Sequence, residues 1–279
     1  MLWRDQQERI VPSASASGVA GLFVAEQLRN APGVWIPRTE IHLVVRFGSR
    51  SPSGVDAHAV GVRKRVHRKA LHAGQRTVTA RLRLGAHEAV LGVPAAQIVE
   101  RIVALEDLWG SAATRELGER LADSRSTTEA VVILERVIAE RLAAAPPGRA
   151  PSSLALSAAT MLARLNVAAV AEELGVSERH LRRVFTEAVG VSPKAFAKLA
   201  RFRRALRAAS QDRPQSWASI AAASGYYDQA HLIAEFRAIA GATPSAFLGE
   251  LEPAGLTASR GSAGRARPRV ARPSAVPGR

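Results

Sequence analysis

Two stretches of the chain share one pattern and decide the fold of its C-terminal part. The first is VAAVAEELGVSERHLRRVFTEAVGVSPKAF at residues 167–196, and the second is WASIAAASGYYDQAHLIAEFRAIAGATPSAF at residues 217–247. Gly175 and Gly225 lie 50 residues apart, whereas the leucine, phenylalanine and proline that follow in each copy lie 51 apart. The chain therefore contains a duplicated segment, with one residue inserted just after the turn of the second copy.

Each copy has the pattern of two short helices joined by a tight turn. The alanine-rich first segment favours a helix that neighbours can approach closely. Gly175 or Gly225 supplies the left-handed residue that ends this helix. Ser177 or Asp228 can cap the helix that follows. This is the spacing of a helix-turn-helix unit, so we expect two such units.

The second helix of the first copy has a basic outward face. In a helix-turn-helix unit, the outward N-terminal residues of this helix enter the major groove, where arginine can hydrogen-bond guanine edges. The inward positions are expected to be Leu181, Val184 and Phe185. The outward positions are Arg179, His180, Arg182 and Arg183. The pattern predicts that this face reads DNA.

A long helix is expected between the copies, from Pro193 to Ala209, opening at Ser192-Pro193. Its basic residues recur at steps of four, three, three and three: Lys194, Lys198, Arg201, Arg204 and Arg207. The helix would hold the two units at a fixed separation. Its basic face has two interpretations, a row of phosphate contacts or a solvated surface, and the sequence leaves both open.

The paired units resemble the AraC/XylS-type transcription regulators. The resemblance is carried by the Gly-x-Ser-x-x-x-Leu-x-x-x-Phe pattern at 175–185, by GYYDQAHL at 225–232 and by the repeated Ser/Thr-Pro-x-x-Phe endings, and it covers roughly residues 152–250. The segment from Trp35 through LEDLWG at 105–110 is similar to the cupin-related sensor domain of one branch of that family. The resemblance implies a DNA-binding regulator with an N-terminal sensor for a small-molecule effector.

The resemblance also implies which residues contact DNA. In the first unit the base- and backbone-contacting positions fall on Arg179, Arg182 and Arg183. In the second unit they fall on Gln229, Ala230, His231, Ile233 and Ala234. Ser177, His180, Lys198 and Arg201 complete the predicted interface. Family members commonly carry arginine where this chain has Ala234, which acidic Glu235 follows. We therefore expect the first unit to supply most base readout and the second to dock on the backbone, with Gln229 as its main polar probe.

The N-terminal part is predicted to be α+β. Short β-branched runs separated by Gly, Pro and Ser clusters at 34–36, 41–47, 55–66 and 77–84 favour a small antiparallel sheet. After Gly85 the spacing becomes helical, first over 94–109 and then over a helix that a capping box opens, Ser126-x-x-Glu129. The apolar stripe of this second helix belongs either to the core of the same domain or to a dimer seam.

Composition divides the chain into four segments. Residues 1–145 are expected to form a sensor or dimerisation domain, and the Pro/Gly-rich residues 146–151 a linker. Residues 152–250 are expected to form the double helix-turn-helix domain. Residues 251–279 lack large apolar side chains and are expected to be a disordered basic tail.

Charge and cysteine content limit the classes of function. The net charge of +15 favours an anionic partner, and double-stranded DNA fits best with the paired units. The absence of cysteine excludes disulfides, thiolate nucleophiles and cysteine-bound metal. The N-terminus has no signal-peptide pattern, and no apolar run is long enough to cross a membrane, so a soluble cytoplasmic protein is expected.

An enzyme would need a catalytic constellation, and the sequence contains none. The histidines of the sheet-rich part are His42, His58, His67, His72 and His87. No His-x-His motif or accompanying carboxylate marks a metal site, so these are interpreted as ordinary core or surface residues and no cofactor is expected. The cluster Arg63-Lys64-Arg65 with Arg68-Lys69 is interpreted as a solvated strand edge, with a polyanion contact or the mouth of an effector pocket as alternatives.

Three functions fit the sequence. The first is a sequence-specific, effector-responsive regulator, for which RNA polymerase and a second copy of the chain stay open as partners. The second is a nonspecific or architectural DNA-binding protein driven by net charge and the tail. The third is a regulator fused to an enzymatic or carrier N-terminal domain.

Overall fold

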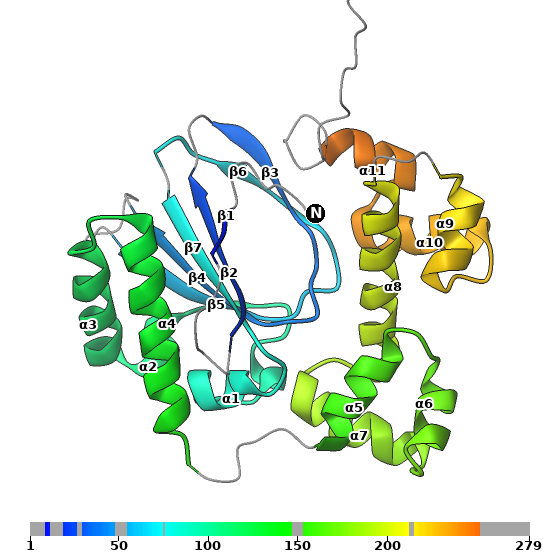
Figure 1. Cartoon of the computed structure of the whole chain (residues 1–279), viewed down its shortest axis with the longest axis horizontal. Coiled ribbons are helices and arrows are strands. Elements are labelled where there is room, and N and C mark those ends of the chain that lie inside the picture. Colours follow the sequence, from blue (N-terminus) through cyan, green and yellow to red (C-terminus); the bar gives the residue numbers. More distant parts are fainter. Residues whose placement is uncertain are drawn as a thin grey trace, which may run out of the picture.

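The computed structural model describes residues 9–11, 19–26, 30–47, 55–74, 76–146, 153–211 and 215–251. These residues form an N-terminal part of strands and helices (residues 9–146) and an all-helical C-terminal part (residues 153–251), which lie side by side (Figure 1). Most of the expected linker, from residue 147, and the expected tail, from residue 252, lie outside the described residues. Among the described residues, none of the helices combines the length and apolar character that crossing a bilayer requires.

Two antiparallel sheets build the N-terminal part and confirm the α+β prediction. The larger has the strand order β1 (Arg9–Val11), β2 (Val19–Glu26), β7 (Arg76–Leu82), β4 (His42–Phe47), β5 (Val55–Val60), β8 (Ile102–Ala104). The smaller pairs β3 (Ala31–Trp35) with β6 (His67–Leu71). Successive residues of the central strand β4, Leu43, Val44 and Val45, are all buried, because both faces of this strand are covered.

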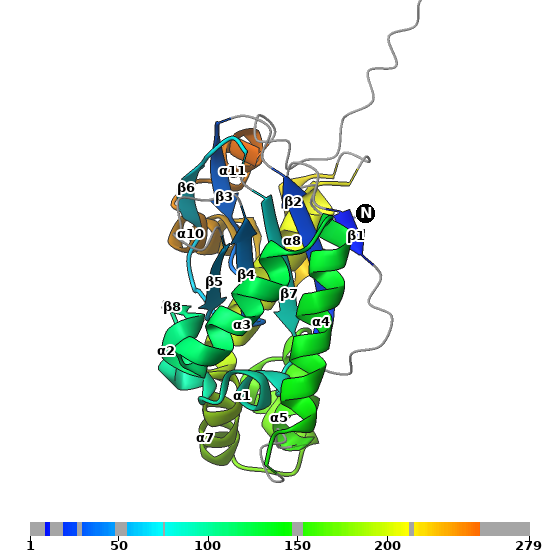
Figure 2. The same cartoon turned by 90° about the vertical axis from the view of Figure 1, so that its left-hand side faces the viewer.

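Five helices complete the N-terminal part among the residues that the structure describes. They are α1 (Ala86–Leu91), the 3-10 helix η1 (Ala95–Gln97), α2 (Leu105–Trp109), α3 (Ser111–Ala122) and α4 (Thr127–Ala143). Helices α3 and α4 cover one side of the larger sheet, and the C-terminal helices lie beyond its other side (Figures 1 and 2).

Helix α4 begins at the predicted capping box. The Ser126 side chain accepts a hydrogen bond from the Glu129 backbone N–H, and the Glu129 carboxylate accepts one from the Arg125 N–H. The apolar stripe of α4 is buried within this chain, which supports its assignment to the core of the domain over a dimer seam. The buried members are Ala130, Val131, Leu134, Val137 and Ile138.

The prediction of a helix over residues 94–109 is wrong for the middle of this segment. Pro94 does precede a helical turn, but that turn ends at Gln97. Residues Ile102–Ala104 instead form β8, which pairs with β5, and a helix resumes only at Leu105. The apolar spacing of this segment fits a helix, and the edge of the sheet overrides that local pattern.

Over residues 153–211 and 215–251 the C-terminal part consists of seven helices. They are α5 (Ser153–Leu162), α6 (Val167–Glu173), α7 (Glu178–Val189), α8 (Pro193–Ala209), α9 (Trp217–Ser224), α10 (Gln229–Ala240) and α11 (Pro244–Leu251). The long helix α8 has the predicted bounds and runs from the group α5–α7 to the group α9–α11 (Figure 1). Its Phe202 ring centroid lies 4.6 Å from that of Phe236 and 6.1 Å from that of Phe247, so α8 forms part of the core of the second unit.

Candidate nucleic-acid interface

The two turns have the predicted construction. Gly175 and Gly225 adopt left-handed φ values of 64° and 80°. The Ser177 hydroxyl accepts a hydrogen bond of 3.2 Å from the His180 N–H, and the Asp228 carboxylate accepts one of 2.7 Å from the His231 N–H. Each cap satisfies a backbone donor at the start of a second helix, α7 in the first unit and α10 in the second, and so fixes where its outward face begins.

The outward face of α7 is exposed over its N-terminal half. Leu181 and Phe185 are fully buried beneath it. Arg182 pairs with Glu178, and Arg183 lies 3.3 Å from Glu187, each one turn away on the helix. Exposed ion pairs of this kind contribute little free energy and can open when a stronger anion approaches. The exposed predicted contacts here are Ser177, Arg179, His180, Arg182 and Arg183.

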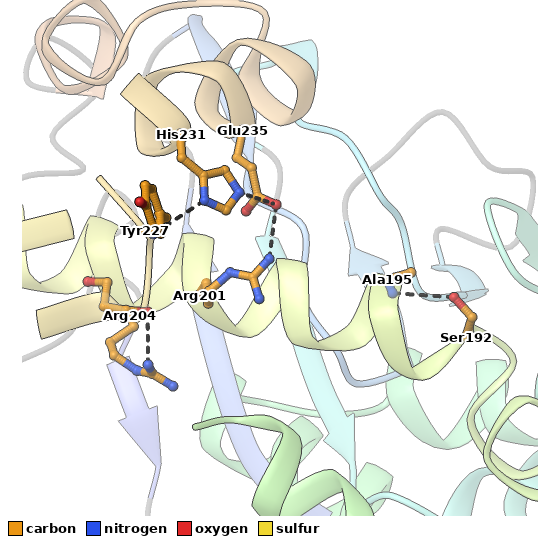
Figure 3. Close-up of polar contacts among 8 residues, drawn as sticks. Ser192, Ala195, Arg201, Arg204, Tyr227, His231 and Glu235 are labelled. Atoms are coloured by element: carbon orange, nitrogen blue, oxygen red, sulfur yellow. Dashed lines mark hydrogen bonds and ion pairs between the residues drawn. The ribbon is translucent and has the colours of Figure 1, made fainter. Parts of the chain in front are cut away.

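The outward face of α10 has fewer charged side chains than that of α7. Gln229, Ala230, His231 and Ala234 are exposed, and Ile233 is half-buried. The His231 ring is held on both sides (Figure 3): Nδ1 accepts a hydrogen bond of 3.4 Å from the Tyr227 N–H, and Nε2 lies 3.6 Å from the Glu235 carboxylate. Gln229 is thus the most freely presented polar side chain of this face.

Helix α8 uses part of its basic row to hold the second unit. Arg201 donates to the Glu235 carboxylate at 3.0 Å, and Arg204 donates to the Ser224 backbone carbonyl at 2.9 Å (Figure 3). Burial lowers the pKa of Arg204. Lys194 and Arg207 are exposed and Lys198 is half-buried. The predicted contact Arg201 is therefore tied to α10, while Lys198, the other α8 position expected at DNA, is half-buried as well.

Tyr227 is a residue that the sequence prediction missed. It is the residue inserted in the second copy, directly before the cap Asp228, and it is 93% exposed. Its neighbour Tyr226 is buried against Arg201, whose guanidinium carbon lies 5.7 Å from the ring centroid. Burial raises the pKa of Tyr226. The one-residue shift between the two repeat intervals was the signal that pointed to this position.

The histidines of the N-terminal part do not assemble a metal site among the described residues. Burial, followed by the charge of Arg38, lowers the pKa of His42 to about 3. Burial lowers the pKa of His87 to about 4. These two residues are thus neutral at physiological pH, while His72 is exposed.

The basic cluster at 63–69 is only partly a solvated edge. Lys64 and Arg65 are exposed. Arg68, although half of its side chain is accessible, forms hydrogen bonds to Glu250 in α11 and to the Ala240 carbonyl at the end of α10. Its main role in the structure is a contact with the C-terminal part, which none of the three sequence interpretations included.

Comparison with known proteins agrees with this geometry. A family model described as a helix-turn-helix domain matches residues 170–250. Residues 170–250 are an AraC-type helix-turn-helix domain. The AraC-type domain is a DNA-binding module of transcription regulators.

The chain is also similar to several solved structures, at low sequence identity. The C-terminal domain of AraT, a response regulator from Geobacillus stearothermophilus, is 22% identical, with 36% of this chain and 87% of that chain covered and a TM-score of 0.34. The DNA-binding domain of AdpA in complex with a target DNA is 22% identical, with 36% and 90% covered and a TM-score of 0.32. ToxT from Vibrio cholerae O395 is 10% identical, with 82% and 96% covered and a TM-score of 0.39. No curated protein matches the chain in sequence.

Proposed function

We propose that this protein is a sequence-specific regulator that binds double-stranded DNA and reads bases mainly with α7. The observation that carries the proposal is the contrast between the two recognition helices. Helix α7 exposes three arginines within its first two turns, whereas the outward face of α10 begins with Gln229 and Ala230 and has its arginine, Arg237, only in the last turn. Arginine is the commonest side chain that reads guanine in the major groove.

The second unit is proposed to position the protein on the phosphate backbone. Arg201 on α8, which lies beside this unit, is engaged by Glu235. Gln229 has an exposed amide that can donate to phosphate or to a base edge. The unit therefore contributes contact area and register, while the first unit contributes most discrimination between sequences.

The N-terminal part is proposed to be an effector-responsive sensor, with boundaries at 1–145, 146–151 for the linker, 152–250 for the DNA-binding domain and 251–279 for a basic tail. In support, β6 and η1 contact α10 and α7 of the C-terminal part directly, so a ligand that shifts these segments could act on the units. A small-molecule effector, RNA polymerase and a second copy of the chain are the proposed partners besides DNA.

The alternative is nonspecific binding driven by the charge of +15. Both functions predict salt-dependent affinity, because both release counterions from DNA. They differ in discrimination between sequences.

Selection of bound duplexes from random DNA with the full chain tests the proposal. We expect one enriched site with two major-groove segments about 10 base pairs apart. Affinity for that site is then compared with affinity for a scrambled duplex of the same length at several salt concentrations. Equal affinity for both duplexes at every salt concentration would establish the nonspecific alternative.

A further inference from the structure

The two recognition helices end against two different places on the N-terminal part. Helix α7 ends at Val189, and a Cβ atom on its cap Gly190 would lie 2.6 Å from Val99 Cγ2 and 3.0 Å from the carbonyl of Ala95. Helix α10 ends at Ala240, whose carbonyl accepts a hydrogen bond of 2.8 Å from Arg68. Equivalent ends of the duplicated units thus both rest on the same N-terminal body.

The contact at α10 is a specific one. The Val66 N–H donates to the Ile239 carbonyl at 2.8 Å, which ties the backbone before β6 to the last turn of α10. The Arg68 guanidinium donates to both carboxylate oxygens of Glu250, from Nε at 2.6 Å and from a terminal nitrogen at 2.9 Å. A two-point arginine–carboxylate pair fixes orientation as well as distance. A cation at the C-terminal end of a helix also complements its free carbonyl groups.

A third contact lies between these two, on the helix that joins the units. Arg203 in α8 donates to the Glu40 carboxylate at 3.2 Å, and their side chains are only 19% and 22% exposed. The N-terminal part therefore contacts α7, α8 and α10 at separate points. Movement of one unit relative to the other would break at least one of them.

The residues proposed to contact DNA lie away from the three contacts with the N-terminal part. In both helices the docked residues are C-terminal, and the exposed predicted contacts, such as Arg179 and Gln229, are at the N-terminal end. The docked arrangement thus leaves the major-groove faces accessible while it restricts how far apart and at what angle they are presented.

We infer that the N-terminal part sets the separation and mutual orientation of the two recognition helices, with Arg68 as a positioning residue for the second unit. The inference rests on the proposed function. Because successive major-groove segments on one side of B-DNA repeat about every 10 base pairs, a fixed separation of the helices selects a fixed spacing in the DNA.

The test compares binding of the full chain to its selected site and to versions with one or two base pairs inserted or removed between the two segments. Arg68→Gln is compared with wild type. Arg65→Gln is the matched control, since Arg65 is exposed on the same connection and loss of its charge weakens attraction to DNA equally. We expect wild type and Arg65→Gln to prefer one spacing sharply. Arg68→Gln should lose about fivefold or more in affinity at that spacing and bind the altered spacings with nearly equal affinity.

A second variant tests the inference if Arg68→Gln lowers the stability of the folded protein. Glu250→Gln removes the charge of the partner and leaves the hydrogen bond from Arg68 to the Ala240 carbonyl in place. Its preference for one spacing is therefore expected to be weaker than that of wild type and stronger than that of Arg68→Gln. A uniform affinity loss with unchanged spacing preference in both variants would overturn the inference and leave the proposed function standing. Wild-type protein that shows no sequence preference at all would instead overturn the proposed function.

Discussion

Gly190 and Gly241 show how one residue type serves two purposes. Both are left-handed caps, with φ values of 85° and 72°, at equivalent ends of α7 and α10. Gly241 has open space where a side chain would lie, whereas Gly190 faces Val99 and the backbone of Ala95. The conformation is local, but the close approach at Gly190 belongs to the contact between the two parts of the chain.

Alanine substitution at these two glycines separates the two effects. A left-handed alanine costs about 1–2 kcal/mol at either position. Gly190→Ala must also displace Val99 or the Ala95 carbonyl, so we expect a larger loss in the free energy of unfolding than for Gly241→Ala. Denaturant unfolding of the two variants measures the difference, and equal losses would show that the contact at Gly190 contributes nothing.

The turn of the second unit is longer, from its glycine to the next helix, than the turn of the first. The inserted residue is the exposed Tyr227, beside the N-terminus of α10. A tyrosine hydroxyl can donate a hydrogen bond to a phosphate, and the ring loses little side-chain freedom when it is ordered. The position favours a backbone contact and not a base contact.

Tyr227→Phe and Tyr227→Ala test that role. We expect Tyr227→Phe to bind a few-fold more weakly, since about 0.5–1.5 kcal/mol is typical of one hydrogen bond, with the same order of preferred sequences. Tyr227→Ala should be weaker again. A binding titration over matched and mismatched duplexes measures both. Changed sequence preference with unchanged affinity would argue for base readout instead.

Elements whose ends are fixed by nearby residues were predictable from the sequence. The caps Ser126, Ser177 and Ser192, together with the turn glycines, placed α4, α7 and α8 correctly because each depends on atoms within a few residues. The exposed face of α7 followed from the same register.

Elements that depend on distant partners were not predictable. Strand β8 exists because β5 offers it a free edge, and β6 is a short basic strand without apolar alternation. The contacts between the two parts join residues 163 and 182 positions apart in sequence, Glu40 with Arg203 and Arg68 with Glu250. No local pattern around Arg68 distinguishes it from its exposed neighbour Lys69.

Stability of the whole molecule should fall in acid. His87 is 4% exposed, and burial lowers its pKa from 6.5 to about 4. Between these two values the unfolded chain binds a proton that the folded chain does not, so stability decreases as the pH falls through this window and is unaffected above it. His42, with its pKa of about 3, acts in the same direction.

Replacement of His87 isolates its share of the acid sensitivity. His87→Gln should reduce the slope of unfolding free energy against pH between 6.5 and 4 by up to about 1.4 kcal/mol per pH unit. The exposed His72→Gln variant is the control and should keep the wild-type slope. Parallel slopes for all three proteins would contradict a neutral buried imidazole at His87.

Base readout by α7 is tested by one comparison of binding affinities. Arg182→Ala, Gln229→Ala and the control Arg136→Ala, an exposed arginine on α4, are titrated against the selected site and its single base-pair variants. We predict that Arg182→Ala loses about 1–3 kcal/mol of binding free energy and discriminates less between bases at one position of the site. Gln229→Ala should lose less binding free energy, and Arg136→Ala should bind like wild type. Unaltered site preference in Arg182→Ala, together with its loss in Gln229→Ala, would show that α10 and not α7 reads the bases.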